Sequence, residues 1–125
     1  MIVYGYLPMM ISAQCIRKTT LGCSGKPEIM WLKDRKEMRF PVVNQCRFCY
    51  NTIYNSAPLS LLGLSASVEE LGPKALRLNF TVEEPAAAGE NLDAFFEEYA
   101  LGEKAAEPSV LKNQFTRGHF KRGVE

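Results

Sequence analysis

Histidine and long hydrophobic runs are scarce in this chain, and each shortage narrows what the chain can do. His119 is the single histidine, so any mechanism that pairs a histidine with a cysteine or a serine must use it. No apolar run approaches the roughly 20 residues that a membrane-spanning helix needs. The chain also lacks the His-Glu-x-x-His zinc helix, the Gly-x-Ser-x-Gly elbow and a glycine-rich phosphate loop. We therefore expect no membrane partner and no active site of a familiar protease type.

Cysteine is absent outside residues 15–49, a stretch that holds all four: Cys15, Cys23, Cys46 and Cys49. The last two form a Cys-x-x-Cys motif, which lets two thiolates face one metal from a single tight turn. Two further cysteines can complete a tetrahedral zinc or iron–sulfur site. The first pair is spaced too widely for an ordinary zinc knuckle, which favours iron–sulfur ligation.

Two other interpretations of the cysteines stay open, namely inert thiols buried as small hydrophobes, and disulfides. Disulfides require an oxidising compartment. The apolar start of the chain does not resemble an export signal, because it lacks a basic leading segment and contains Tyr4, Tyr6 and Pro8. We therefore expect a cytoplasmic protein.

The net charge of +1 conceals a strong segregation of charge along the chain. Residues 17–47 carry eight basic and three acidic side chains, a net of +5. Residues 69–107 carry three basic and ten acidic side chains, a net of −7, and residues 112–125 carry four basic and one acidic, a net of +3. Such blocks suit an anionic partner for the basic segments, and they also suit an ordinary solvated surface.

At 125 residues, 46% of them hydrophobic, the chain has the size and composition of one globular domain. The nearly continuous apolar run 2–11 predicts a strand buried on both faces, as in a parallel sheet covered by helices, with a break at Pro8. Segment 29–42, with apolar runs on both sides of a charged turn, predicts a β-hairpin whose open end brings Cys23 and Cys46 together. Trp31 and Phe40 are expected to pack as a cross-strand pair.

The second half of the chain predicts helices that alternate with one strand. Proline and an N-cap residue near position 56 indicate a short helix to about Leu62, and residues 67–71 form a second helix that Gly72 ends. The alternating stretch 75–82 predicts a strand. Helical spacing of apolar residues over 90–101 predicts a core helix, with surface connections at 85–89 and 103–108.

Two sets of basic side chains are candidates for substrate binding. Arg77 lies within the predicted strand, and a buried or cleft-facing arginine needs an anionic partner, which is a substrate or a structural acid. The basic and aromatic tail can grip an anionic chain, and it can also be a flexible terminus. Its candidate residues are Arg117, His119, Lys121 and Arg122.

Several motifs in order along the chain resemble the collagenase-like peptidase family U-32. They are Val3 to Met10 leading into Cys15, the Cys46-x-x-Cys49 motif, Asn55 to Leu61, Leu76-Arg77-Leu78, and Phe115 to Val124. The resemblance covers nearly the whole chain. Members of that family carry a (β/α) barrel-like domain and are labelled peptidases without an agreed catalytic residue set. Relatives take part in hydroxylation of RNA bases or quinone precursors, and some bind an iron–sulfur cluster through four cysteines.

The resemblance implies an α/β fold, specifically a partial (β/α) barrel-like fragment with a cysteine-rich β-hairpin insertion, because a complete barrel needs roughly 200 residues or more. The expected parts are a buried strand at 1–14, the cysteine-rich hairpin region at 15–50, helices and a strand at 51–102, and a linker with the basic tail at 103–125. The partner of such a fragment is the missing barrel half or a second copy, and the fragment alone is expected to be inactive.

For function, the resemblance implies a protein of the peptidase class with a four-cysteine site for a 4Fe–4S cluster or zinc. The implied metal ligands are Cys15, Cys23, Cys46 and Cys49. One alternative is a cluster-dependent protein of RNA hydroxylation, acting on tRNA or rRNA. The other is a noncatalytic module that zinc stabilises and that binds a peptide or RNA partner.

Overall fold

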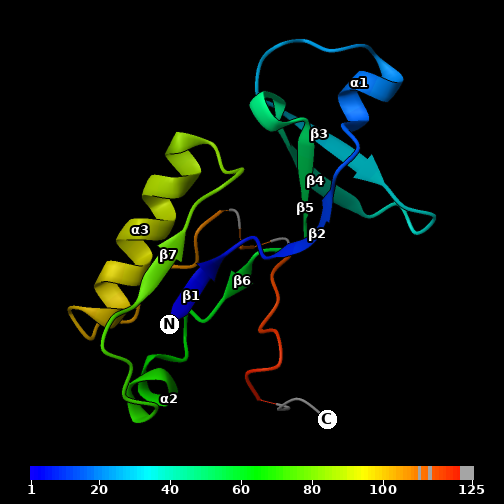
Figure 1. Ribbon diagram of the computed structural model, residues 1–125. Coiled ribbons are helices and arrows are strands. Elements are labelled where there is room, and N and C mark those ends of the chain that lie inside the picture. Colours follow the sequence, from blue (N-terminus) through cyan, green and yellow to red (C-terminus); the bar gives the residue numbers. More distant parts are fainter. Residues whose placement is uncertain (110, 113, 122–125) are drawn as a thin grey trace. The chain divides into compact units, whose positions relative to one another are not determined.

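The computed structural model describes residues 1–109, 111–112 and 114–121. The chain divides into two compact units. The cysteine unit is Tyr6–Ser56, and the core unit combines Met1–Gly5 with Ala57–Glu125. Over the described residues the fold is mixed α/β, with one sheet in each unit and helices α1 to α3 (Figure 1).

The cysteine unit is built on an antiparallel sheet in the order β2-β5-β4-β3. Its strands are β2 (Pro8–Ser12), β3 (Glu28–Lys33), β4 (Arg39–Gln45) and β5 (Tyr50–Tyr54). The short helix α1 (Ile16–Thr20) follows β2, and the single 3-10 turn η1 (Cys46–Phe48) joins β4 to β5. Every cysteine of the chain therefore belongs to this unit.

The predicted hairpin is confirmed in β3 and β4. Asp34 closes its turn, because Oδ1 accepts hydrogen bonds from the backbone N–H groups of Lys36 at 2.8 Å and Met38 at 2.9 Å. The predicted pairing of Trp31 with Phe40 is wrong. Trp31 lies opposite Pro41, and Phe40 lies opposite Leu32, so the two rings point to opposite faces of the sheet.

The core unit holds the smaller sheet, in the order β6-β1-β7. Strand β1 (Ile2–Gly5) pairs antiparallel with β6 (Leu59–Ser60) and parallel with β7 (Arg77–Asn79). Gly5 has φ +145, and a Cβ at this position would lie 2.5 Å from the backbone oxygen of Asn79. Only glycine therefore permits the close approach of β1 and β7 here.

The core unit also contains α2 (Ser65–Glu70) and α3 (Pro85–Tyr99). In Figure 1, α3 runs alongside β7. Side chains from both helices, from β1 and from the segments around β6 form one hydrophobic cluster. Its buried members are Val3, Tyr4, Leu61, Val68, Phe95 and Leu111. This cluster accounts for the burial of β1 from Val3 onward.

The apolar run at the start forms two strands in different sheets, where the sequence predicted one buried strand. β1 is buried from Val3 to Gly5, whereas β2 is exposed from Pro8 to Ile11. β2 is an edge strand, which tolerates the missing N–H of Pro8 and leaves its side chains open to solvent. The predicted break near Pro8 is confirmed.

Three predictions in the second half differ from the structure. Instead of a helix to Leu62, the segment forms β6, because backbone groups of β1 and Thr116 hydrogen-bond to it. The strand predicted at 75–82 shortens to β7. Residues 85–89, predicted as a connection, begin α3, since proline suits the first helical position and alanine is the best helix former.

A barrel is not seen in the part of the chain that the structure describes. Neither sheet closes on itself, and β1 with β7 is the only parallel pair among the described strands. The α/β class is confirmed, whereas the barrel-like arrangement stays a prediction. No helix formed by the described residues has both the length and the apolar character to cross a membrane.

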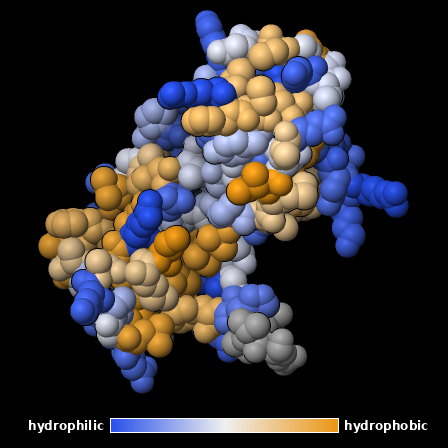
Figure 2. Space-filling model, viewed as in Figure 1, coloured by the Kyte–Doolittle hydropathy of each residue, from blue (hydrophilic) through white to orange (hydrophobic). Residues whose placement is uncertain are grey.

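The predicted core helix is confirmed as α3, but it buries only part of its apolar surface. Phe95 is 2% exposed, whereas Leu92 is 52% and Phe96 is 57% exposed. Figure 2 shows hydrophobic side chains on the surface over this helix. The sequence periodicity therefore identified the helix and overestimated how much of it is covered.

Candidate metal centre

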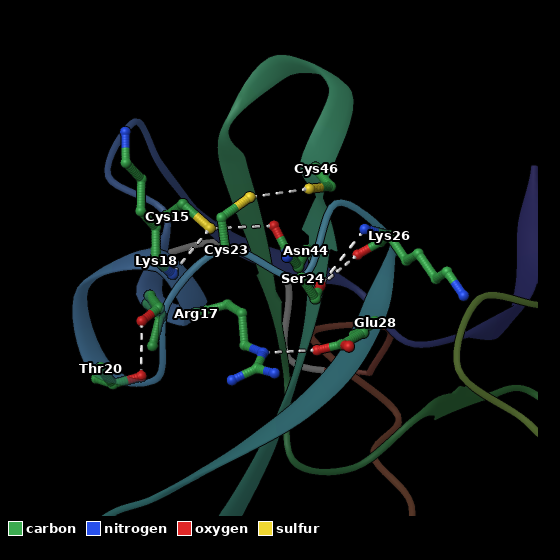
Figure 3. A network of polar contacts seen from close by, with 11 residues as sticks. Cys15, Arg17, Lys18, Thr20, Cys23, Ser24, Lys26, Glu28, Asn44 and Cys46 are labelled. Carbon is green, nitrogen blue, oxygen red and sulfur yellow. Dashed lines mark hydrogen bonds and ion pairs between the residues drawn. The ribbon is translucent and has the colours of Figure 1, made fainter.

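The hairpin brings two of the four cysteines together. Cys23 lies in the loop between α1 and β3, and Cys46 follows directly after β4. Because β3 and β4 pair antiparallel, the start of one strand lies beside the end of the other. The two Sγ atoms are 3.8 Å apart and point toward one another (Figure 3). The approach that the sequence predicted for Cys23 and Cys46 is thus confirmed.

The sulfur separation matches the geometry of a metal site. Two thiolates that each lie about 2.3 Å from one zinc ion in a tetrahedral arrangement are about 3.8 Å from one another. A disulfide needs a sulfur–sulfur distance of only about 2.05 Å. All four cysteines are free thiols. The Cys23 and Cys46 pair is therefore spaced as two ligands of one metal rather than as a closed disulfide.

Cys49 lies in the same turn as Cys46. Its backbone N–H donates to the carbonyl oxygen of Cys46 at 3.3 Å, and its thiol donates to the same oxygen at 3.7 Å. Cys49 has φ 54 and ψ 36, the left-handed conformation that residues other than glycine and asparagine seldom adopt. Its side chain is exposed. The turn thus holds Cys49 next to Cys46 at some cost in backbone strain.

Cys15 is the one buried cysteine, with 5% of its surface exposed. It is the N-cap residue of α1, where its Sγ accepts a hydrogen bond from the backbone N–H of Lys18 at 3.5 Å. The same thiol donates to Oδ1 of Asn44 at 3.3 Å. Cys15 is therefore held by contacts on two sides (Figure 3).

Among residues 1–109, 111–112 and 114–121, no group of three or more histidine, cysteine or acidic side chains converges as metal ligands. The described geometry thus fits two ligands, Cys23 and Cys46. The Cys15 and Cys49 sulfurs instead hold hydrogen bonds to protein oxygens. A four-cysteine site requires both of these sulfurs to exchange those contacts for the metal.

The two facing thiols differ in acidity. A backbone hydrogen bond from Gly25, and next the hydrogen bond from Cys46, hold the pKa of the Cys23 thiol below its ordinary value. The pKa of Cys46 is raised, first because its thiol donates to Cys23 and next because of desolvation. Cys23 is therefore the thiol that loses its proton more readily, and the thiolate is the form that binds metals.

An ion pair ties the cysteine loop to the sheet. Arg17 Nε, in α1, lies 2.9 Å from Oε2 of Glu28, the first residue of β3 (Figure 3). Both side chains are partly exposed, so the pair contributes little to stability. Its geometric effect is to link α1 to the strand that follows the Cys23 loop.

The candidate substrate residues lie in the core unit, apart from the cysteine loop along the chain. Arg77 is an exposed residue of β7, so the burial that would require an anionic partner is absent. Arg117 is partly buried and donates through Nη1 to the carbonyl oxygens of Ser60 and Leu62. Its guanidinium also lies 4.8 Å from the Phe115 ring centroid. These contacts make Arg117 a structural clamp on the segment around β6.

The other tail candidates have fewer described contacts. His119 and Lys121 are exposed. Arg122 lies outside the residues that the structure describes. The tail was expected to be flexible, but Thr116 forms a parallel bridge to Leu59, so this part of it is joined to the core unit. The structure does not gather these basic side chains into one site.

Sequence reasoning missed two buried asparagines beside the cysteines. Asn44 is 1% and Asn51 is 0% exposed, and they lie opposite each other on β4 and β5. The available signal was a polar residue within each predicted strand, close to Cys46 or Cys49 in sequence. Comparisons of the chain with protein-family models, curated proteins and solved structures give no match. The cysteine site is therefore interpreted from its own geometry.

Proposed function

We propose that this chain belongs to the collagenase-like peptidases of family U-32 and that its cysteine unit holds an iron–sulfur cluster or a zinc ion. The ordered motifs along the chain support the family. The observation that carries the metal site is the 3.8 Å separation between Sγ of Cys23 and Sγ of Cys46. In this proposal those two sulfurs are the first ligands, and Cys49 and Cys15 complete the set.

A bound metal would supply folding free energy to the cysteine unit, and a cluster would also supply electron transfer. The cysteine unit has few buried side chains: Cys15, Val42, Ile53, Asn44 and Asn51, with Pro41. Units of this size often depend on a metal or on disulfides, because their hydrophobic cores supply too little stability. This small core supports a structural role for the metal in addition to any chemistry.

Metal analysis tests the proposal directly. Iron, acid-labile sulfide and zinc are measured on protein purified without oxygen, and the visible absorption spectrum is recorded on the same sample. Iron with sulfide in near-stoichiometric amounts is expected for a cluster, and zinc alone for a structural clasp. Protein that contains neither metal and takes up neither on reconstitution would refute the site.

Matched variants separate ligation from general damage. Cys23→Ser and Cys46→Ser are expected to lose most of the metal, and Cys49→Ser to lose metal and melt at a lower temperature. Thr20→Ser, a conservative change at the end of α1, serves as the control and should retain the metal. Full metal retention in the three cysteine variants would show that the thiols are inert.

Peptidase activity is part of the proposal through the family label alone. Metal-loaded protein is incubated with gelatin and with unstructured peptides, and the products are separated by mass spectrometry. Cleavage that disappears in Cys46→Ser would support a metal-dependent peptidase. Intact substrates with fully loaded protein would remove peptidase activity from the proposal and leave the metal site standing.

Action on RNA is the second candidate, and the charge of the cysteine unit supports it. Residues 17–47 carry a net charge of +5. Their exposed basic side chains are Lys18, Lys26, Lys33, Arg35, Lys36, Arg39 and Arg47. Binding of tRNA or rRNA fragments that weakens steeply with salt, and weakens further when Lys26 and Arg39 are changed to glutamate, is the expected result. Unchanged binding in that double variant would contradict it.

The third candidate is a noncatalytic module in which zinc only stabilises the fold and a peptide or RNA binds elsewhere. Zinc alone, without redox changes in the spectrum, is the result that favours it. The proposal includes a partner, either further barrel elements or a second copy, and the exposed Leu92 and Phe96 of α3 support one. Sedimentation of the purified chain at several concentrations tests whether it associates with itself.

A further inference from the structure

A buried asparagine contacts the most enclosed cysteine. Asn44, in β4, is 1% exposed, and its Oδ1 accepts the hydrogen bond of the Cys15 thiol at 3.3 Å (Figure 3). Its register partner on β5 is Asn51, which is 0% exposed. Asparagine is seldom buried so completely, because its amide loses hydrogen bonds to water. Two such residues opposite one another in one sheet therefore need an explanation.

Asn51 contacts the residue that precedes Cys15. Its Nδ2 donates to the carbonyl oxygen of Gln14 at 2.7 Å. Its Oδ1 is buried and has no hydrogen-bond partner. An unpartnered buried carbonyl weakens a fold, and such groups are rare. The asparagine pair is thus costly to the sheet, while both of its described polar contacts lead to the Gln14–Cys15 segment.

Metal ligation reverses what the Cys15 sulfur can do in a hydrogen bond. A thiol donates its proton, as Cys15 does to Asn44. When a thiol binds a metal its proton leaves to water, and the resulting thiolate can only accept. Oδ1 of Asn44 cannot donate, but Nδ2 on the same carbon carries two N–H groups. A half-turn about the Cβ–Cγ bond exchanges these two atoms.

We infer that Asn44 is a positioning residue for Cys15, accepting its thiol proton in the metal-free chain and donating an amide N–H to its sulfur in the metal-bound chain. The inference rests on the proposed function, because it assigns a partner to one of the proposed ligands. The backbone N–H of Lys18 already donates to the same sulfur, so Asn44 supplies a second donor. Outer hydrogen bonds of this kind orient metal ligands and tune their strength.

The test uses Co²⁺ added to the metal-free full chain, because the thiolate absorption of bound cobalt reports both affinity and ligand environment. Asn44→Asp keeps the shape and removes the N–H donors, and Asn44→Leu removes both amide groups. Both variants are expected to bind Co²⁺ about 10-fold or more weakly and to show a shifted thiolate band. A merely structural asparagine would lower stability without moving that band.

Asn91→Leu is the matched control. Asn91 is likewise 0% exposed, but it lies in α3 of the core unit and donates through Nδ2 to the carbonyl oxygen of Ala87 at 2.8 Å. This variant should bind Co²⁺ as the unchanged chain does. If the Asn44 variants fail to fold, the side-chain amide signals of Asn44 are followed by NMR in the unchanged chain while Zn²⁺ is added. Those signals should shift, and the Asn91 signals should not.

The possible outcomes separate this inference from the proposed function. Metal uptake by the unchanged chain, with unaltered Co²⁺ affinity and spectrum in folded Asn44 variants, would overturn the role of Asn44 alone. Unmoved Asn44 amide signals on zinc binding would do the same. If the unchanged chain binds neither Co²⁺ nor Zn²⁺, the proposed site and the role of Asn44 both fail.

Discussion

Gly5 is the residue with the least freedom to change. Its φ of +145 is open only to glycine, and a Cβ there would lie 2.5 Å from the backbone oxygen of Asn79. Gly5→Ala is therefore expected to lower the free energy of unfolding by about 1–3 kcal/mol, because β1 and β7 must move apart. Urea unfolding measures this change.

Gly89→Ala is the matched control for that prediction. Gly89 lies within α3, and a Cβ there would meet no atom within 4 Å. The same substitution should therefore raise the free energy of unfolding by about 0.5–1 kcal/mol, because alanine loses less entropy in a helix. Equal effects at positions 5 and 89 would refute the close approach of β1 and β7.

Tyr99 joins α3 to the segment after β6 through its hydroxyl, which donates to the carbonyl oxygen of Leu61 at 2.7 Å. Desolvation, and next the charge of Glu98, raise the pKa of Tyr99 to about 12. The folded chain therefore favours the protonated phenol. Its contribution to stability is complete below the ordinary tyrosine pKa of about 10 and is lost as the pH rises through about 12.

Tyr99→Phe should lower the free energy of unfolding by about 0.5–1.5 kcal/mol near neutral pH, the usual worth of one hydrogen bond. The difference between the variant and the unchanged chain should shrink as the pH rises above about 10. Thermal unfolding over a pH series measures it. A constant difference up to about pH 12 would contradict the assigned hydrogen bond.

At the scale of elements, α3 has one covered face and one open face. Phe95 is 2% exposed and stacks with Tyr99 at a ring centroid distance of 5.6 Å, whereas its neighbour Phe96 is 57% exposed. Phe95→Ala should cost about 3–5 kcal/mol of unfolding free energy, and Phe96→Ala about 0.5 kcal/mol or less. Denaturant unfolding of the two variants provides the comparison. Similar losses would mean that Phe96 is covered in solution.

Elements with strong local signals could be predicted, and elements made by distant partners could not. The hairpin of β3 and β4 follows from two apolar runs around a charged turn, and α3 from its helical periodicity. β6 has no such signal, because Leu59 and Ser60 become a strand only by pairing with Tyr4 and Gly5. The helix start at Pro85 was readable from the alanines that follow it, since alanine favours helices.

The same distinction applies to the candidate site. The approach of Cys23 and Cys46 is a consequence of the hairpin, so the sequence predicted it. The contact of Cys15 with Asn44 joins residues 29 positions apart and depends on how β4 pairs with β5. No local pattern encodes that register, which is why the asparagines were missed.

For the molecule as a whole, two units with different cores imply two responses to metal. The core unit has its own hydrophobic cluster, whereas the cysteine unit has few buried side chains. Metal at 100 times its dissociation constant stabilises the form that binds it by about 2.7 kcal/mol. Chelation should therefore speed amide hydrogen exchange at Val42 and Ile53 and leave exchange at Val3 and Phe95 unchanged.

Hydrogen exchange followed by mass spectrometry, with and without a chelator, makes that measurement. A Cys46→Ser sample serves as the control, because it should already exchange at the faster rate and respond no further to chelator. Equal acceleration in both units would contradict an independent cysteine unit. Unchanged exchange in both, with metal removed, would mean that the metal contributes nothing to folding.

The left-handed backbone of Cys49, at φ 54, has a consequence for which residues selection tolerates. Glycine or asparagine would relieve strain of about 1–2 kcal/mol there, so a library of all substitutions at position 49 sorted only for folded protein should enrich those two. The same library sorted for metal retention should return cysteine. A lineage that kept cysteine here would thus have been held by the use of the thiol, against the preference of the fold.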